Sequence, residues 1–597
     1  MKHIKARRLL PLRYRGSLGA RDRGINYKKG QRRIWESPIF PVPTFHPFKE
    51  ETRGNSATIS ASSKDVRIGV TWWGVRPSPM KAYVSVSKVM SSMAKALERN
   101  YRVVFLENLN TDDEAAQREV LARLLREVDI VFSNINFFPC SLVYKVREDL
   151  NRSVPIAFAV LGNMPSGGSA IREIAPFLRR GDVILFSSKA DIAIFEKMVL
   201  KCNATSWYLP FAVDCQIFRP LPESNNRMTR LSIGVPLDAP FLLYVGRIHP
   251  EKNLHALFWM LQEIVKEYPR STLCIVGPIE NDQFPHFDIP VDGYYGYLRK
   301  EIKRRKLGGH VLLLGNQPER SLVALYSAAD ILLNPTISVT ENFGYTPVEA
   351  MACGTPVVCS RIGGLKDTVV EGETGFFMDT ILTNHGVKLD WRTGVEAVLR
   401  LLGDKSLRRQ MGENGVRRVR EHFSMERFSS NLAQIVDFIS KNFPSSHDEP
   451  QGEVIFSPDV LSLWDEIYKH EGGEMDEESQ WHVHKALLSR NSYKFLAEPY
   501  VSHVADNISV NLRSILYPAV PLRLSKKERR LKVEDPIWPC AYQLEDWEME
   551  ILEEIISGRR KIQALVNQMK GRIQTADIPS FVEKLIREGI ILPHSLS

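Results

Sequence analysis

The sequence contains few cysteines, and they form no pattern typical of a metal site. Seven cysteines are scattered over 597 residues, and no two are spaced Cys-x-x-Cys. Zinc sites and disulfide frameworks use closely spaced or even-numbered cysteines. The set therefore predicts free thiols in a reducing cytoplasm and no metal site.

Long apolar runs are also absent. No stretch of about 18 residues is both apolar and uncharged, so a membrane-spanning helix is not expected. The basic residues of Met1–Leu10 are followed by no apolar segment, which argues against a secretory signal. The expected location of the protein is the cytoplasm.

Beyond its first 54 residues, the chain has almost no net charge. The net charge is +9, yet residues 1–54 alone carry fourteen Lys and Arg against four Asp and Glu, so the remainder is close to neutral. A neutral body argues against nucleic-acid binding, which needs clustered cations. Residues 1–64 are expected to be a disordered basic tail and linker. The alternative is peripheral contact of this tail with the anionic inner face of a membrane.

Short apolar segments alternate with amphipathic ones in two successive series. The first series predicts strands at 66–70, 101–106, 129–132, 154–160 and 183–187, with helices at 84–98 and 114–127. The second predicts strands at 241–245, 271–276, 310–314, 330–334 and 356–359, with helices at 253–267, 294–306, 319–328 and 345–352. This alternation predicts an α/β fold of two doubly wound, Rossmann-like lobes, 65–222 and 223–425, that face a cleft. A crossover helix at 426–445 is expected to return to the first lobe.

A glycine and two cations follow the first strand of the second series. The segment reads Gly246-Arg247-Ile-His-Pro-Glu-Lys252-Asn253. Glycine allows a sharp turn out of the sheet, and the helix expected to begin near Asn253 offers free amides to an anion. Arg247 and Lys252 are therefore candidates to hold a diphosphate. A pair of ordinary surface cations is the alternative.

Two glutamates follow the strand that ends at Asn334. They lie in the segment Glu341-Asn342-Phe343-Gly344-Tyr345-Thr-Pro-Val-Glu349. The proline suits the first turn of a helix, which places Glu349 in or just beyond that turn and Glu341 in the loop before it. Carboxylates only accept hydrogen bonds, so this pair suits ribose and sugar hydroxyls. In the alternative, Glu349 merely favours the helix N-terminus and Glu341 is exposed.

With these two segments, residues from about 66 to 442 resemble a family 4 glycosyltransferase of the GT-B fold. The Glu-x7-Glu pair and the Gly-Arg-x-x-x-Glu-Lys-Asn segment carry the resemblance. Further matching segments are Val213–Pro220, Gly363-Gly364-Leu, Val370–Phe376, Leu407–Gly415 and His422–Ser424.

The resemblance implies a retaining hexosyltransferase that uses a nucleotide-sugar donor and needs neither a metal nor a cofactor. Arg247 and Lys252 would bind the donor phosphates, Glu349 the ribose, and Glu341 the sugar near its reacting centre. Glu341, Arg247 and Lys252 are thus the implied catalytic residues. The remaining implied donor contacts are Gly74, Gly246, Asn342, Phe343, Gly344 and Tyr345. The acceptor would be a glycan, a lipid-linked group or a peptide.

One position departs from the family pattern. Members often carry a histidine after the strand at 156–160, where this chain has Leu161-Gly162-Asn163. The departure indicates an unusual acceptor side. A degenerate scaffold or a nucleotide-sugar sensor is the alternative function, but the intact Arg247 and Glu341 favour an enzyme.

Residues 446–597 lie outside the resemblance. A helix is expected at 459–470, followed by an acidic stretch at 471–478. His482 and His484 are two residues apart, a spacing that does not place them on one helix face for a metal.

The last part of the chain has helical periodicity. Apolar residues recur at helical spacing in 544–556, 562–569 and 578–586 and lead to an apolar strand at 589–592, which predicts a mainly helical, winged-helix-like domain. It is loosely similar to small domains that bind leader peptides. Leu544–His594 carries seven Lys and Arg against nine Asp and Glu, so a protein or peptide partner is preferred over nucleic acid. The alternatives are a packing appendage and a regulator whose lobes only sense a ligand.

Overall fold

The structure is a computed structural model of the chain. It describes residues 66–72, 84–106, 113–134, 140–161, 164, 168–279, 293–443, 454–462, 464, 497–533, 535, 540–558, 561–572, 574 and 577–593. Outside these ranges lie the expected tail and linker at 1–64, most of the expected helix at 459–470, the acidic stretch at 471–478, and Gly74, Gly162, Asn163, His482 and His484. Within the described ranges, every helix is too short or too polar to span a bilayer.

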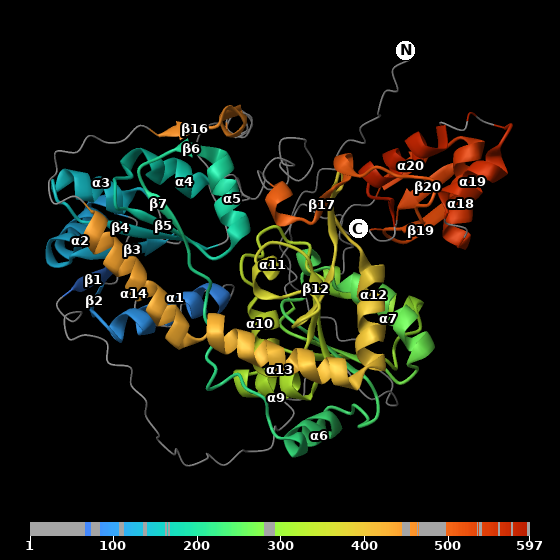
Figure 1. Ribbon diagram of the computed structural model, residues 1–597, viewed down its shortest axis with the longest axis horizontal. Coiled ribbons are helices and arrows are strands. Elements are labelled where there is room, and N and C mark those ends of the chain that lie inside the picture. Colours follow the sequence, from blue (N-terminus) through green and yellow to red (C-terminus); the bar gives the residue numbers. More distant parts are fainter. Residues whose placement is uncertain are drawn as a thin grey trace, which may run out of the picture. The chain divides into compact units, whose positions relative to one another are not determined.

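Six parallel strands form the sheet of the first lobe (Figure 1). Their order is β2-β1-β3-β4-β5-β7. The strands are β1 (Arg67–Val70), β2 (Arg102–Phe105), β3 (Ile130–Asn134), β4 (Ile156–Val160), β5 (Val183–Phe186) and β7 (Thr205–Tyr208). The helices are α1 (Val84–Glu98), α2 (Glu114–Glu127), α3 (Leu142–Asp149), α4 (Ser169–Ile174) and α5 (Lys189–Met198). Strands β3 and β4 are buried throughout, as expected for a parallel sheet covered on both faces.

Six parallel strands also form the sheet of the second lobe, in the order β10-β9-β8-β11-β12-β13. They are β8 (Phe241–Val245), β9 (Thr272–Val276), β10 (Val311–Gly315), β11 (Ile331–Asn334), β12 (Val357–Ser360) and β13 (Gly375–Met378). The helices that connect them are α7 (Leu254–Glu267), α8 (Gly293–Arg304), α9 (Glu319–Ala328), α10 (Tyr345–Ala352) and α11 (Leu365–Thr368). The two doubly wound sheets confirm the predicted α/β, GT-B fold class.

The strand order places two loops of the second lobe side by side. Strands β8 and β11 are neighbours, with Leu242 beside Ile331, and the order of strands reverses between them. Open α/β sheets bind ligands where the order reverses, outside the carboxyl ends of the strands. The loops that follow β8 and β11 are the two that carry the predicted site residues.

A long helix joins the second lobe back to the first. Helices α12 (Trp391–Gly403) and α13 (Lys405–His422) lead to α14 (Met425–Asn442), which packs against α1 (Figure 1). The Ser429 hydroxyl donates to the carbonyl of Ala96 at 3.1 Å and accepts from Asn100 at 3.3 Å.

Short strands attach the C-terminal region to both lobes. Strand β16 (Ile455–Phe456) pairs antiparallel with β6 (Val199–Lys201) of the first lobe. Strand β17 (His503–Val504) pairs parallel with β14 (Thr380–Thr383), which forms a hairpin with β15 (Gly386–Leu389) in the second lobe. The sequence analysis did not predict these pairings.

The appended domain contains more strand than the sequence analysis predicted. Its helices α18 (Asp546–Ser557), α19 (Ile562–Met569) and α20 (Asp577–Arg587) lie close to the expected ranges. Before them, β19 (Leu522–Ser525), β20 (Arg530–Val533) and β21 (Cys540–Gln543) form an antiparallel sheet. Strand β18 (Leu516–Pro518) pairs with β22 (Ile591–Pro593). The described part of the domain therefore has these strands in addition to the three predicted helices.

The appended domain shares a hydrophobic core with the second lobe. Tyr517 of β18 is buried in one cluster with Trp259 of α7 and Trp391 of α12. Its hydroxyl donates to Asp390, and the Arg392 guanidinium lies 4.5 Å from the Trp391 ring and 4.9 Å from the Tyr517 ring. The packing makes the two parts a single structural unit.

Tyr500, just before β17, contacts both lobes. It is fully buried, its hydroxyl donates to Asp191 of α5, and its carbonyl accepts from the Gly363 amide of the second lobe at 2.9 Å. Burial raises the pKa of Asp191 to about 6, although hydrogen bonds from Tyr500 and Ser188 oppose the shift. A buried carboxyl thus lies at the contact between the lobes.

Replacing Asp191 with asparagine is expected to remove a pH-dependent loss of stability. Between the unfolded pKa of about 3.9 and the folded pKa, the folded chain holds a proton that the unfolded chain has released. Wild-type stability therefore falls as pH rises through this window, by about 3 kcal/mol in all, and is level above pH 6. The thermal unfolding temperature of Asp191→Asn should exceed that of wild type at pH 7 but not at pH 4. Identical pH profiles would contradict this expectation.

Candidate functional site

The loop after β8 holds the two predicted phosphate-binding cations. The Gly246 amide donates to the Val276 carbonyl of β9 at 2.9 Å, so the loop begins directly at the carboxyl end of β8. A single 3-10 turn, Pro250–Lys252, then leads to Asn253, whose φ of 55° allows the chain to enter α7. This geometry keeps Arg247 and Lys252 at the carboxyl end of the central strand.

Glu251 links these cations, although the sequence analysis gave it no role. Its carboxylate lies 2.7 Å from the guanidinium of Arg247 and 3.9 Å from the amine of Lys252, and it accepts from the Ser338 hydroxyl at 3.2 Å. Burial alone would raise the pKa of Glu251, but Lys252, His249 and Arg247 lower it to about 2. Glu251 is therefore a fixed negative charge that orients both cations.

Lys252 and Glu341 come together across the two loops. The Lys252 amine donates to the Glu341 carboxylate at 2.8 Å, and both side chains are less than one-fifth exposed. Burial favours the neutral amine, but the carboxylates of Glu341 and Glu251 raise the pKa of Lys252 above its usual value. The predicted phosphate ligand and the predicted sugar ligand are thus direct neighbours.

Two glycines shape the loop that carries Glu341. Gly344 has a φ of 80°, and a Cβ there would lie 2.2 Å from the Leu365 side chain. Gly363 has a φ of 48°, and a Cβ there would lie 2.1 Å from the Glu341 carbonyl oxygen. A side chain at either position would clash with these atoms and strain the backbone, so the loop could not keep this conformation.

The backbone of this loop offers hydrogen-bond donors. In the described part of the chain, no hydrogen bond takes the amides of Phe343, Gly344 or Tyr345, and α10 begins at Tyr345. The first amides of a helix have no partner within it and attract anionic or hydroxyl groups. The donor contacts expected for Phe343, Gly344 and Tyr345 stay a prediction.

Glu349 is buried in α10 and is held by two groups. The Tyr326 hydroxyl donates to one carboxylate oxygen at 3.0 Å, and the Lys88 amine of α1 forms an ion pair with the other. The same amine lies 4.7 Å from the Phe218 ring and 4.9 Å from the Tyr345 ring. Neither Lys88 nor Tyr326 was predicted, because no local sequence signal joins residues this far apart in the chain.

The other predicted side chains of the loop lie between the lobes or in the core. The Asn342 amide donates to the Ser187 hydroxyl of the first lobe at 2.7 Å. Phe343 is buried, with its ring 5.5 Å from Phe211 and 5.0 Å from Tyr345. The Phe343 side chain therefore packs in the core beneath the loop and is not exposed to a ligand.

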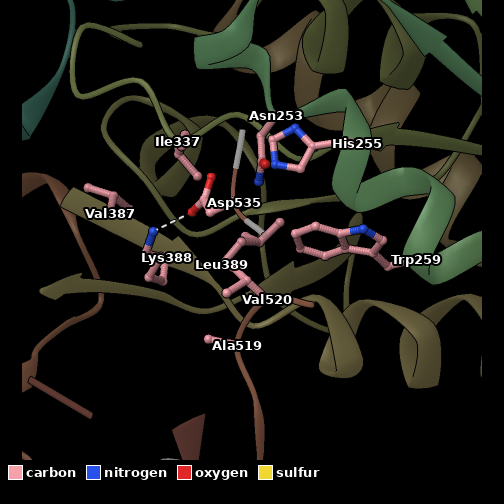
Figure 2. A pocket seen from close by; sticks show the side chains of 10 residues that line it. All are labelled: Asn253, His255, Trp259, Ile337, Val387, Lys388, Leu389, Ala519, Val520 and Asp535. Atoms are coloured by element: carbon pink, nitrogen blue, oxygen red, sulfur yellow. Dashed lines mark hydrogen bonds and ion pairs between the residues drawn. The ribbon is translucent and has the colours of Figure 1, made fainter. Parts of the chain in front are cut away.

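A pocket lies where the start of α7 meets the appended domain (Figure 2). Asn253 and His255 line it from the start of α7, Lys388 from β15, and Asp535 from the appended domain. Lys388 and Asp535 form a buried ion pair at 2.5 Å. His255 accepts or donates at 2.8 Å with Tyr294, and burial lowers its pKa to about 4. The second lobe and the appended domain thus both line this pocket.

The comparisons with known proteins cover the part of the chain that holds the site. Residues 228–418 match the family model of glycosyl transferases group 1. The matched range lies within the second lobe. The matched range includes every predicted site residue except Gly74, which lies outside the described residues, and it also includes Glu251 and Tyr326. In the described residues, no group of three or more His, Cys, Asp and Glu is arranged to hold a metal.

Curated relatives and solved structures were also found. D-inositol 3-phosphate glycosyltransferase of Corynebacterium efficiens is 32% identical over 225 residues, which are 37% of this chain and 48% of that protein. D-inositol 3-phosphate glycosyltransferase 2 of Catenulispora acidiphila is 32% identical over 38% of this chain and 49% of that protein. The chain spans about half the length of these curated relatives. Anabaena HepE, solved with UDP-glucose, is 17% identical with a TM-score of 0.49, over 63% of this chain and 99% of HepE.

Proposed function

We propose that the protein is a hexosyltransferase that takes a sugar from a nucleotide-sugar donor and retains its anomeric configuration. The cluster of Arg247, Glu251, Lys252 and Glu341 at the carboxyl ends of β8 and β11 is the observation that carries this proposal. It combines cations for a diphosphate with a carboxylate for sugar hydroxyls at one point. The match to the family model of glycosyl transferases group 1 supports the same reaction class.

The two cations would stabilise the leaving group. When the bond between the anomeric carbon and the diphosphate oxygen breaks, negative charge grows on the diphosphate. Arg247 and Lys252 would neutralise this charge without a metal, and Glu251 fixes their positions. The Lys252 amine donates to Glu341 in the structure. A bound phosphate would take over part of this interaction, and Glu341 could then accept hydrogen bonds from the sugar.

The two glutamates would orient the donor. Glu341 would accept from hydroxyls of the transferred sugar, and Glu349 from the ribose, while the amides of Gly344 and Tyr345 bind oxygen atoms between them. Correct placement of the donor carbon beside the acceptor hydroxyl is a large part of catalysis in such reactions.

Replacing Lys88 with methionine is expected to raise the donor KM about ten-fold and to change kcat by less than about two-fold, because a hydrogen bond to a buried carboxylate is lost. Methionine keeps the apolar stem but leaves Glu349 with Tyr326 alone. Steady-state kinetics over donor concentration would measure both constants. Lys88→Arg should restore KM, and Lys95→Met, at an exposed position on the same helix, is the matched control. A loss confined to kcat would contradict this role.

The acceptor side is proposed from the rest of the chain. A glycan, a lipid-linked group or a peptide would enter beside the first lobe. The winged-helix-like appended domain would hold a protein or peptide partner, and its fixed packing on the second lobe supports such a role. The basic residues of 1–54 would contact an anionic membrane surface.

A panel of nucleotide sugars tests the proposed activity. Purified protein is incubated with each donor, with and without acceptors, and released nucleotide diphosphate is measured. We expect one donor to be consumed and Glu341→Gln to lower the rate about 100-fold without loss of thermal stability. Unchanged turnover in Glu341→Gln would contradict the residue assignment. Donor binding without turnover would favour a nucleotide-sugar sensor.

A further inference from the structure

The sheet of the appended domain has one apolar face and one basic face. In β20, Leu531 and Val533 are buried, while Arg530 and Lys532, which alternate with them, are exposed. Successive side chains of a strand point to opposite faces, so the register of the sheet defines each face. Arg523 lies opposite Lys532, and Ser525 opposite Arg530. The outer face, defined by these pairs and their β21 neighbours, consists of Arg523, Ser525, Arg530, Lys532, Ala541 and Gln543.

The three cations of this outer face have no acidic partner among the described residues. Salt bridges do hold the neighbouring cations of the β19–β20 turn, because Lys526 pairs with Glu553 and Arg529 with Asp546. No such pair is found for Arg523, Arg530 or Lys532, and the outer face contains no carboxylate. The positive charge of this face is therefore available to a ligand.

Stability of the sheet does not explain these cations. Arg523 and Lys532 stand directly opposite each other, and like charges in that position destabilise a strand pair. Charged residues on an edge strand do protect against aggregation. However, Arg530 and Lys532 lie on the central strand β20, where no edge needs protection.

The strand next to these cations has an open edge. Strand β19 is the first in the order β19-β20-β21. In the described part of the chain, no backbone group pairs with it on the side away from β20. An edge of this kind accepts an extended peptide as an additional strand.

We propose that the outer face of the β19–β20–β21 sheet binds an extended acidic segment of a partner protein. The segment would add to the edge of β19, with its carboxylates beside Arg523, Arg530 and Lys532. The open edge favours a polypeptide, because neither a lipid headgroup nor a nucleic-acid phosphate uses backbone donors and acceptors in this way. The face also offers no large apolar side chain for insertion into a membrane. This inference does not depend on the proposed transferase activity.

Fluorescence anisotropy with the full chain at low salt tests this inference, since salt screens exposed charges. The probe is a fluorescein-labelled peptide of about twelve residues in which Glu and Thr alternate. We expect its Kd to rise about ten-fold or more in Arg523→Gln/Arg530→Gln/Lys532→Gln, as three exposed charge pairs are lost. A Glu and Pro peptide of equal charge should bind about ten-fold more weakly, because proline lacks the amide that strand pairing needs.

A matched variant distinguishes an effect of this face from an effect of the domain's net charge. Lys561→Gln/Lys570→Gln/Lys584→Gln removes three exposed cations elsewhere in the same domain, and its Kd should stay within about two-fold of wild type. Equal weakening in both triple variants would overturn the inference. So would equal binding of the two peptides. Tighter binding of phosphatidylserine vesicles or single-stranded DNA than of the Glu and Thr peptide would also overturn it.

Discussion

Lys252→Met is expected to lower kcat for release of nucleotide diphosphate about 100- to 1,000-fold, because one preorganised charge that faces the leaving group is lost. The Lys252 amine lies in hydrogen-bond contact with Glu341 and within 3.9 Å of Glu251. Removing it takes away the donor that would bind the diphosphate and leaves two carboxylates near that charge. Repulsion between them and the diphosphate adds to the loss.

The control for this prediction lies on the helix that follows. Lys266 is exposed near the end of α7 and pairs with Glu263 at the surface, so Lys266→Met should retain wild-type kcat. Single-turnover kinetics at saturating donor would separate chemistry from binding. A Lys252→Met protein that unfolds at the wild-type temperature and keeps wild-type kcat would show that its amine does not act on the leaving group.

The second large effect concerns the joint with the appended domain. Asp535→Ala is expected to cost about 3–5 kcal/mol of unfolding free energy, because it leaves Lys388 buried without a counter-charge. Both side chains are only 5% exposed. The double variant Lys388→Met/Asp535→Leu replaces the pair with apolar groups of similar size and should recover most of that loss.

Tryptophan fluorescence during urea unfolding would measure this loss of unfolding free energy. Trp259 lines the pocket beside Asp535, and its ring lies 6.1 Å from Trp391, so both report on the interface (Figure 2). Arg529→Gln, which breaks an exposed ion pair within the appended domain, is the control and should change stability by less than about 1 kcal/mol. If Asp535→Ala is no more harmful than this control, the ion pair does not hold the joint.

The shared core limits what truncation can show. Removing the chain from residue 450 onward would strip β17 from β14 and expose the apolar surface around Trp391. A loss of activity in such a protein would then reflect damage to the second lobe. Point changes on the outer face of the appended sheet are the cleaner way to examine its role.

The sequence predicts the lobes well because their strands are continuous apolar runs. Phe241–Val245 is buried over its full length, and such runs have few alternatives in an α/β fold. The strands of the appended domain are harder to predict. Leu522–Ser525 and Arg530–Val533 do alternate apolar and polar residues, but each has only four residues, too few for a firm assignment.

The candidate site was predictable only where its residues belong to a motif. Arg247, Lys252 and Glu341 lie in segments whose loops follow neighbouring strands, and strand order brings them together. Lys88 reaches Glu349 over a separation of 261 residues, and Tyr500 reaches Asp191 over 309. Contacts of this kind depend on how the lobes pack, which local patterns do not contain.

In the described part of the chain, two passages connect the lobes, and they restrict how the lobes can separate. The first lies before β8 and the second between α13 and α14. Two bodies joined by two such connections can bend about a hinge but cannot rotate freely. Separation of the lobes would also require Tyr500 to give up a contact, because it hydrogen-bonds to Asp191 of the first lobe and to Gly363 of the second.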